Sequence, residues 1–152
     1  MHLNTDALET SFDQIAPRGD ELMDIFYRRL FVVAPSMLPL FLGLNLQRLK
    51  GKLLATLMLL RGSLRDLDTV TPVLRGLGAR NARYGALPGH YPAAAMLLVS
   101  SMAEIAGEAW TDEHQEAWTQ AFALVSGAML DGAHSAAAVP QTLMRFTRDA
   151  AG

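Results

Sequence analysis

The spacing of its apolar residues constrains this chain more than any other sequence feature. Leucines recur three or four residues apart, and no segment alternates apolar and polar residues for long. The most regular stripe, in a helix predicted from about residue 46 to 64, consists of Leu46, Leu49, Leu53, Leu57 and Leu60. Side chains at this spacing share one face of an α-helix. Leu, Ala and Met also dominate the composition, which favours helices over strands. The predicted fold class is therefore all-α.

Capping residues and prolines divide the N-terminal part of the chain. We predict that Thr5 or Asp6 caps a first helix, which ends before Pro17. Its buried face consists of Leu8, Phe12 and Ile15. Asp20 is predicted to cap a second helix at residues 21–34. The apolar face of this second helix consists of Leu22, Ile25, Phe26, Leu30 and Val33.

Prolines and glycines delimit the remaining elements. A proline-bracketed turn precedes the leucine-striped helix, and the helix after it ends at Gly85. A fifth helix opens at Pro92, which suits a first-turn position, and Thr111 caps a sixth. After Pro140 we expect a short terminal helix as an extension. The length suits one compact core, so residues 1–152 are assigned to a single domain.

Composition excludes several classes of function. The net charge of −2 and the absence of a basic run argue against nucleic-acid binding. Without cysteine there is no disulfide, thiolate nucleophile or thiolate metal ligand. The polar N-terminus does not resemble a signal peptide, and charged residues or prolines interrupt every apolar stretch, so we expect a cytoplasmic protein that does not span a membrane. No phosphate-binding loop, HExxH or GxSxG motif is present, so no enzyme class is indicated.

Several short motifs in a fixed order carry a family resemblance. They are FYRRLF (26–31), PLF (39–41), LG and YG on either side of Asn81, GHYP (89–92) and EAWTQAF (116–122). With these motifs the chain resembles the globins, in particular single-domain bacterial globins and the globin domain of flavohemoglobins, from about residue 12 to 130. The resemblance implies a globin fold of about six to eight helices around one apolar pocket that holds haem.

The resemblance also implies roles on the distal, ligand-binding side of that pocket. Tyr27 matches the tyrosine that stabilises bound oxygen, and Phe41 matches the phenylalanine that packs on the porphyrin. Leu49 falls where a distal glutamine is common, although Lys50 takes that place if the alignment slips by one residue. Leu53 matches an apolar residue above the ligand site.

On the proximal side the chain departs from the family pattern. Asn81 falls on the proximal histidine, Tyr91 matches a proximal-side tyrosine, and the glutamate that this tyrosine usually contacts is replaced by Ala133. A carboxamide is a poor iron ligand because its nitrogen has no basic lone pair. Burial at roughly 25 cal/mol per Å² still permits a porphyrin to bind without that bond.

The other histidines and the methionines leave alternatives open. His90, nine residues after Asn81, is the candidate substitute ligand, or it lies in an exposed corner between helices. His114 and His134 are interpreted as surface residues. Methionines at helical spacing are interpreted as core residues rather than axial ligands.

Two functions follow from this pattern. The first is a divergent globin-type binding protein that lacks the standard haem ligand and acts in a sensor or binding role. Such a protein is haem-free, or it binds haem or another apolar ligand weakly or atypically. The alternative is a working haem protein that binds oxygen or nitric oxide through a non-standard axial ligand. Its redox cycle would need an outside reductase, since 152 residues leave no room for flavin and nicotinamide domains. The last two long helices are rich enough in Ala, Met and Leu to pair in a homodimer.

Overall fold

The prediction of an all-α chain is confirmed. A computed structural model describes residues 3–83 and 85–137, and this part of the chain contains helices and no strand. Six α-helices are present in it: α1 (Thr5–Ile15), α2 (Gly19–Val33), α3 (Leu46–Gly62), α4 (Leu67–Arg83), α5 (His90–Ala106) and α6 (Asp112–Ala137). Short 3-10 helices connect them: η1 (Ala16–Arg18), η2 (Pro35–Phe41) and η3 (Gly107–Ala109). The helix expected after Pro140 lies outside the described residues.

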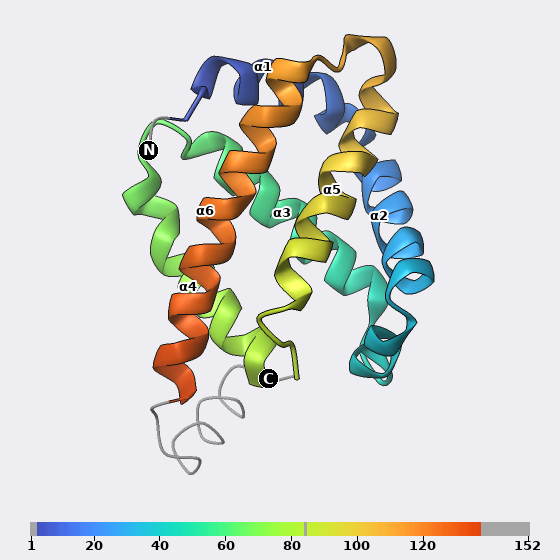
Figure 1. Ribbon diagram of the computed structural model, residues 1–152, viewed down its shortest axis with the longest axis vertical. Coiled ribbons are helices and arrows are strands. Elements are labelled where there is room, and N and C mark those ends of the chain that lie inside the picture. Colours follow the sequence, from blue (N-terminus) through green and yellow to red (C-terminus); the bar gives the residue numbers. More distant parts are fainter. Residues whose placement is uncertain (1–2, 84, 138–152) are drawn as a thin grey trace.

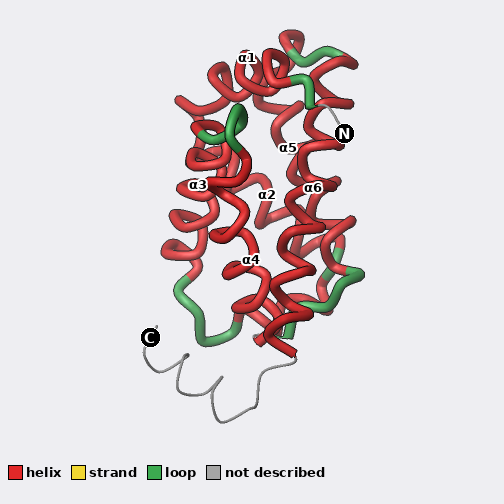
Figure 2. The backbone as a smooth tube through the Cα atoms, turned by 90° about the vertical axis from the view of Figure 1, so that its left-hand side faces the viewer, coloured by secondary structure: helices red, strands yellow, loops and turns green. Residues whose placement is uncertain are grey.

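The helices stack in crossed layers rather than in a parallel bundle. Figure 1 shows α1 across one end of the molecule and α5 between α2 and α6, and α5 packs against both of these helices. Seen from the side in Figure 2, α3 and α6 lie on opposite sides with α4 between them. No helix in the described part of the chain is both long and apolar enough to cross a membrane.

The observed helix starts confirm one predicted cap and correct two others. Thr111 Oγ1 accepts a hydrogen bond from the His114 N–H at 3.1 Å, as expected of a cap for α6. The prediction for α1 is wrong, because Asn4 caps it by accepting from the Ala7 N–H at 3.2 Å. Asp20 does not cap α2, because η1 leads the chain directly into α2 and the helix has already begun at Gly19.

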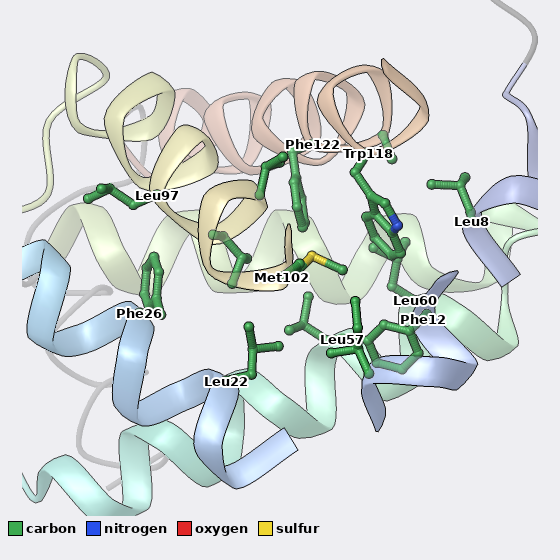
Figure 3. Close-up of a cluster of buried hydrophobic side chains, with 14 of the residues drawn as sticks. Leu8, Phe12, Leu22, Phe26, Leu57, Leu60, Leu97, Met102, Trp118 and Phe122 are labelled. Carbon is green, nitrogen blue, oxygen red and sulfur yellow. The ribbon is translucent and has the colours of Figure 1, made fainter. Parts of the chain in front are cut away.

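The apolar faces predicted for α1 and α2 form the core with one exception. Leu8, Phe12 and Ile15 are buried, and so are the α2 residues Leu22, Ile25, Phe26 and Leu30. Val33 is 59% exposed, because it is the last residue of α2. Figure 3 shows how α5 and α6 complete this core, with Met102 among Leu22, Leu57 and Phe122.

The stripe predicted on α3 is buried only in its second half. Leu57 and Leu60 are 3% exposed each, whereas Leu46, Leu49 and Leu53 are half-buried. The core therefore lies beneath the C-terminal half of α3. Its N-terminal half leaves an apolar face partly uncovered.

One buried polar contact ties the first helix to the last. The Trp118 Nε1–H donates to Ser11 Oγ at 2.8 Å, and the Ser11 hydroxyl donates to the Ala7 carbonyl at 2.6 Å. Both side chains are fully buried. The pair satisfies the indole N–H and fixes α1 against α6.

Candidate functional site

Three aromatic rings from α2 and η2 form the centre of the candidate site. Tyr27 and Phe41 pack edge to face, with ring centroids 6.0 Å apart and an interplanar angle of 83°. Phe31, one turn after Tyr27, lies 5.3 Å from the Phe41 ring and 6.2 Å from the Tyr27 ring. The 3-10 turn from Pro35 to Phe41 brings Phe41 back onto α2. The structure thus brings together Tyr27 and Phe41, which the sequence assigned to one pocket.

The environment of Tyr27 keeps its hydroxyl protonated. Tyr27 is 7% exposed, and burial raises the pKa of its hydroxyl to about 12. No described residue forms a hydrogen bond with this hydroxyl. A protonated phenol is a hydrogen-bond donor at neutral pH, so Tyr27 can donate to a ligand beside the aromatic cluster.

Asn81 lies on the face of α4 that turns toward the interior. Val70 and Leu74 on this face are 1% and 4% exposed. Asn81 follows Leu74 by seven residues, which brings it back to within about 20° of the same direction on a helix. Leu77, one turn before Asn81, packs against the core. The half-buried Asn81 side chain therefore continues an apolar face.

The end of α4 is fixed by a glycine cap. The Ala86 N–H donates to the Asn81 carbonyl at 2.9 Å, and the Gly85 N–H donates to the Ala82 carbonyl at 3.1 Å. Gly85 has φ +102°, so this is the paired-bond helix ending for which glycine is preferred. A Cβ on Gly85 would lie 3.0 Å from Leu40 Cδ2, so the end of α4 contacts η2. Asn81 and Phe41 consequently lie at the same end of the molecule.

The two α3 candidates differ in their packing. Leu53 is half-buried and packs against the core, whereas Leu49 is half-buried without belonging to that apolar cluster. Lys50, the alternative to Leu49, pairs with Asp24 on α2 at 3.0 Å. This ion pair turns Lys50 toward the α2 side of α3. The distal roles of Leu49 and Leu53 remain predictions.

The described histidines are poor candidates for an iron ligand. The Nδ1 atom of His90 accepts a hydrogen bond from the Leu87 N–H at 3.0 Å, and that of His114 accepts from the Thr111 N–H at 3.3 Å. A neutral imidazole that accepts at Nδ1 carries its proton on Nε2, which then has no lone pair for a metal. His134 is exposed near the end of α6. No cluster of three or more metal-binding side chains occurs among the described residues.

The remaining proximal candidates lie on α5 and α6. Tyr91 is half-buried at the second position of α5, where its N–H donates to the Pro88 carbonyl at 3.3 Å. Ala133 is half-buried on α6. The aromatic and aliphatic side chains suit a flat apolar group such as a porphyrin. Neither the Asn81 amide nor the described imidazoles suit an iron ion at its centre.

Sequence reasoning missed Phe31 as part of this site. It lies four residues after Tyr27 on the same helix, a spacing that places two side chains on one face. The signal was therefore present in the sequence. Assigning Phe31 to the site from this spacing also requires the information that Phe41 folds back over this face of α2.

Comparison with known proteins shows the family. The Globin family profile matches residues 24–129. The flavohemoprotein of Bacillus subtilis (strain 168) is 22% identical over 125 residues, which cover 81% of this chain and 31% of that protein. The chain thus spans about a third of the length of the curated relatives it matches.

Two solved structures show the same fold. An engineered carbene transferase from Rhodothermus marinus has a TM-score of 0.76 at 20% identity, covering 90% of this chain and 97% of that one. The flavohemoglobin of Malassezia yamatoensis, solved with bound FAD and haem, has a TM-score of 0.73 at 20% identity over 86% of this chain and 36% of its own. These similarities confirm the predicted globin fold. Since the family profile covers most of the sequence, the chain belongs to the globin family.

Proposed function

We propose that this globin is a ligand-binding protein that holds a flat apolar ligand without an iron–imidazole bond. The observation that carries the proposal is the position of Asn81, a half-buried amide on the inner face of α4 at the point where α4 is capped. In the family resemblance carried by the flanking LG and YG motifs, this residue falls on the proximal histidine. Haem, a metal-free porphyrin and a similar apolar molecule are all candidates for the ligand.

The chain's own residues supply two kinds of interaction for such a ligand. Phe31 and Phe41 offer ring faces and edges, which stabilise a flat aromatic molecule by burial and by ring contacts. Tyr27 adds a protonated hydroxyl that can donate one hydrogen bond. Neither interaction depends on a metal. A protein of this kind is suited to a sensor or binding role rather than to reversible oxygen carriage.

Titration with hemin and with metal-free protoporphyrin IX tests the proposal. Because no imidazole bond favours the iron compound, we expect the two dissociation constants to agree within about tenfold. Reduced, hemin-loaded protein should also lack the absorption spectrum of imidazole-ligated ferrous haem. A much tighter affinity for hemin, together with that spectrum in the unmodified protein, would contradict the proposal.

Two variants test whether Asn81 or His90 determines the haem spectrum and the hemin affinity. Asn81→His should create the imidazole-ligated spectrum and tighten hemin binding while leaving the protoporphyrin affinity nearly unchanged. His90→Ala should alter neither spectrum nor affinity, because the Nδ1 of His90 already accepts from the Leu87 N–H. If His90→Ala instead abolishes a wild-type haem spectrum, the alternative function holds: a haem protein with His90 as its axial ligand, able to bind oxygen or nitric oxide.

A further inference from the structure

Two glycines allow the backbones of α4 and α6 to touch. A Cβ built on Gly78 of α4 would overlap the Met129 carbonyl of α6. A Cβ built on Gly132 of α6 would overlap the Arg75 carbonyl of α4. Both glycines are buried. The contact is reciprocal, since each helix contributes one glycine and receives one carbonyl from its partner.

This requirement for glycine is local to the contact. Gly76 on α4 and Gly127 on α6 have open space where a Cβ would lie. They lie two and five residues from the contact glycines of their own helices. Each of the two helices therefore contains one glycine that the close contact requires and one that it does not. The second glycine of each helix serves as an internal control.

We infer that Gly78 and Gly132 are positioning residues that set the distance of α4 from α3, and so the space open to a ligand beside Asn81. Asn81 lies three residues after Gly78 on the same helix. Residues of α4 contact both α6 and α3, and in the view of Figure 2 α4 lies between these two helices, so we expect a methyl group added at the α6 contact to push α4 toward α3. The effect on a ligand rests on the proposed function, whereas the position of α4 can be measured without one.

Spin labels measure this position directly. The chain has no native cysteine, so Lys52→Cys on α3 and Arg80→Cys on α4 introduce two unique, exposed labelling sites. In the unliganded labelled protein, Gly78→Ala or Gly132→Ala should shorten the label distance by roughly 1–2 Å, the movement that restores van der Waals contact. The same variants without labels should bind protoporphyrin IX at least tenfold more weakly.

Three controls separate positioning from loss of stability. Gly76→Ala and Gly127→Ala should leave both the label distance and the protoporphyrin affinity unchanged. Ser11→Ala, which removes the hydrogen-bond acceptor of Trp118 and leaves both α4–α6 contact glycines in place, should lower stability without changing the distance. If Gly78→Ala or Gly132→Ala prevents folding, that substitution is combined with Gly76→Ala and Gly127→Ala, because alanine has a higher helix propensity than glycine and stabilises both helices.

The outcomes distinguish the two proposals. A shorter distance in Gly78→Ala and Gly132→Ala, but not in the controls, supports the positioning role. An unchanged distance in both contact variants overturns it, whatever their affinity. If unmodified protein binds neither hemin nor protoporphyrin IX while the distance still shortens, the proposed function fails and the placement of α4 by its glycines stands.

Discussion

At the scale of single residues, the burial of Tyr27 has a measurable consequence. Its hydroxyl has a pKa of about 12 in the folded protein against the ordinary 10.0. The folded state therefore holds this proton more tightly than the unfolded state, and the associated stability is present below pH 10 and is lost as the pH rises toward 12. The difference in pKa corresponds to a free energy of roughly 3 kcal/mol.

Comparison with Tyr27→Phe isolates this effect. The variant keeps the ring and removes the ionisable group. From urea unfolding at several pH values, we expect the free energy of unfolding to fall about 2–3 kcal/mol more in the wild type than in Tyr27→Phe between pH 10 and 12. Parallel pH profiles for the two proteins would show that Tyr27 titrates normally.

The Ser11–Trp118 hydrogen bond supports a second prediction at this scale. Ser11→Ala leaves the buried Trp118 N–H without its acceptor, which should destabilise the protein by about 1–3 kcal/mol in urea unfolding. Ser101 is the matched control, since it is equally buried and donates to the Leu97 carbonyl at 2.7 Å. No described side chain donates to it, so Ser101→Ala should cost less. Equal losses in the two variants would argue against a role for the indole bond.

At the scale of the element, the cap of α4 depends on one backbone conformation. Gly85 has φ +102°, whereas Gly89, at the start of α5, has φ −66° and open space around it. Gly85→Ala should destabilise the protein by about 1–2 kcal/mol, because a side chain strains this conformation. Gly89→Ala should stay within about 0.5 kcal/mol of the wild type. Thermal unfolding of the two variants checks the difference, and equal midpoints would refute it.

The elements also show where sequence reasoning stopped. Apolar spacing located the core faces of α1 and α2, since a helical stripe needs only local geometry. It overestimated the burial of Leu46, Leu49 and Leu53, because the pattern does not reveal how far a neighbouring helix extends. It also did not identify Gly78 and Gly132 as contact residues. That contact depends on which turn of α6 meets which turn of α4, and neither helix encodes this register alone.

At the scale of the whole molecule, the described helices share one core. Residues from α1 to α6 belong to a single buried cluster that includes Trp118. We expect one cooperative unfolding transition, with tryptophan fluorescence and far-ultraviolet circular dichroism giving the same midpoint in urea. Separate midpoints for the two signals would contradict the assignment of residues 1–152 to one domain.

The fold was more predictable than the candidate site. Helical spacing and motif order were enough for the all-α class and the globin resemblance, because both are distributed along the whole chain. The site depends on single residues brought together by tertiary structure. Tyr27 and Phe41, which the resemblance assigns to one pocket, have ring centroids 6.0 Å apart, whereas their roles toward a ligand remain predictions. The hydrogen bond to the Nδ1 of His90, which decides its value as a metal ligand, comes from a loop conformation that no sequence pattern indicated.

The bond between Ser11 and Trp118 also bears on how the chain is made. Its partners are 107 residues apart, and α1 packs mainly on α5 and α6. On the ribosome, the first helix leaves the exit tunnel long before these helices are synthesised. Most of the native surface that covers its apolar face is missing until α5 and α6 have been synthesised, so it is during this interval that the nascent chain has most need of a chaperone.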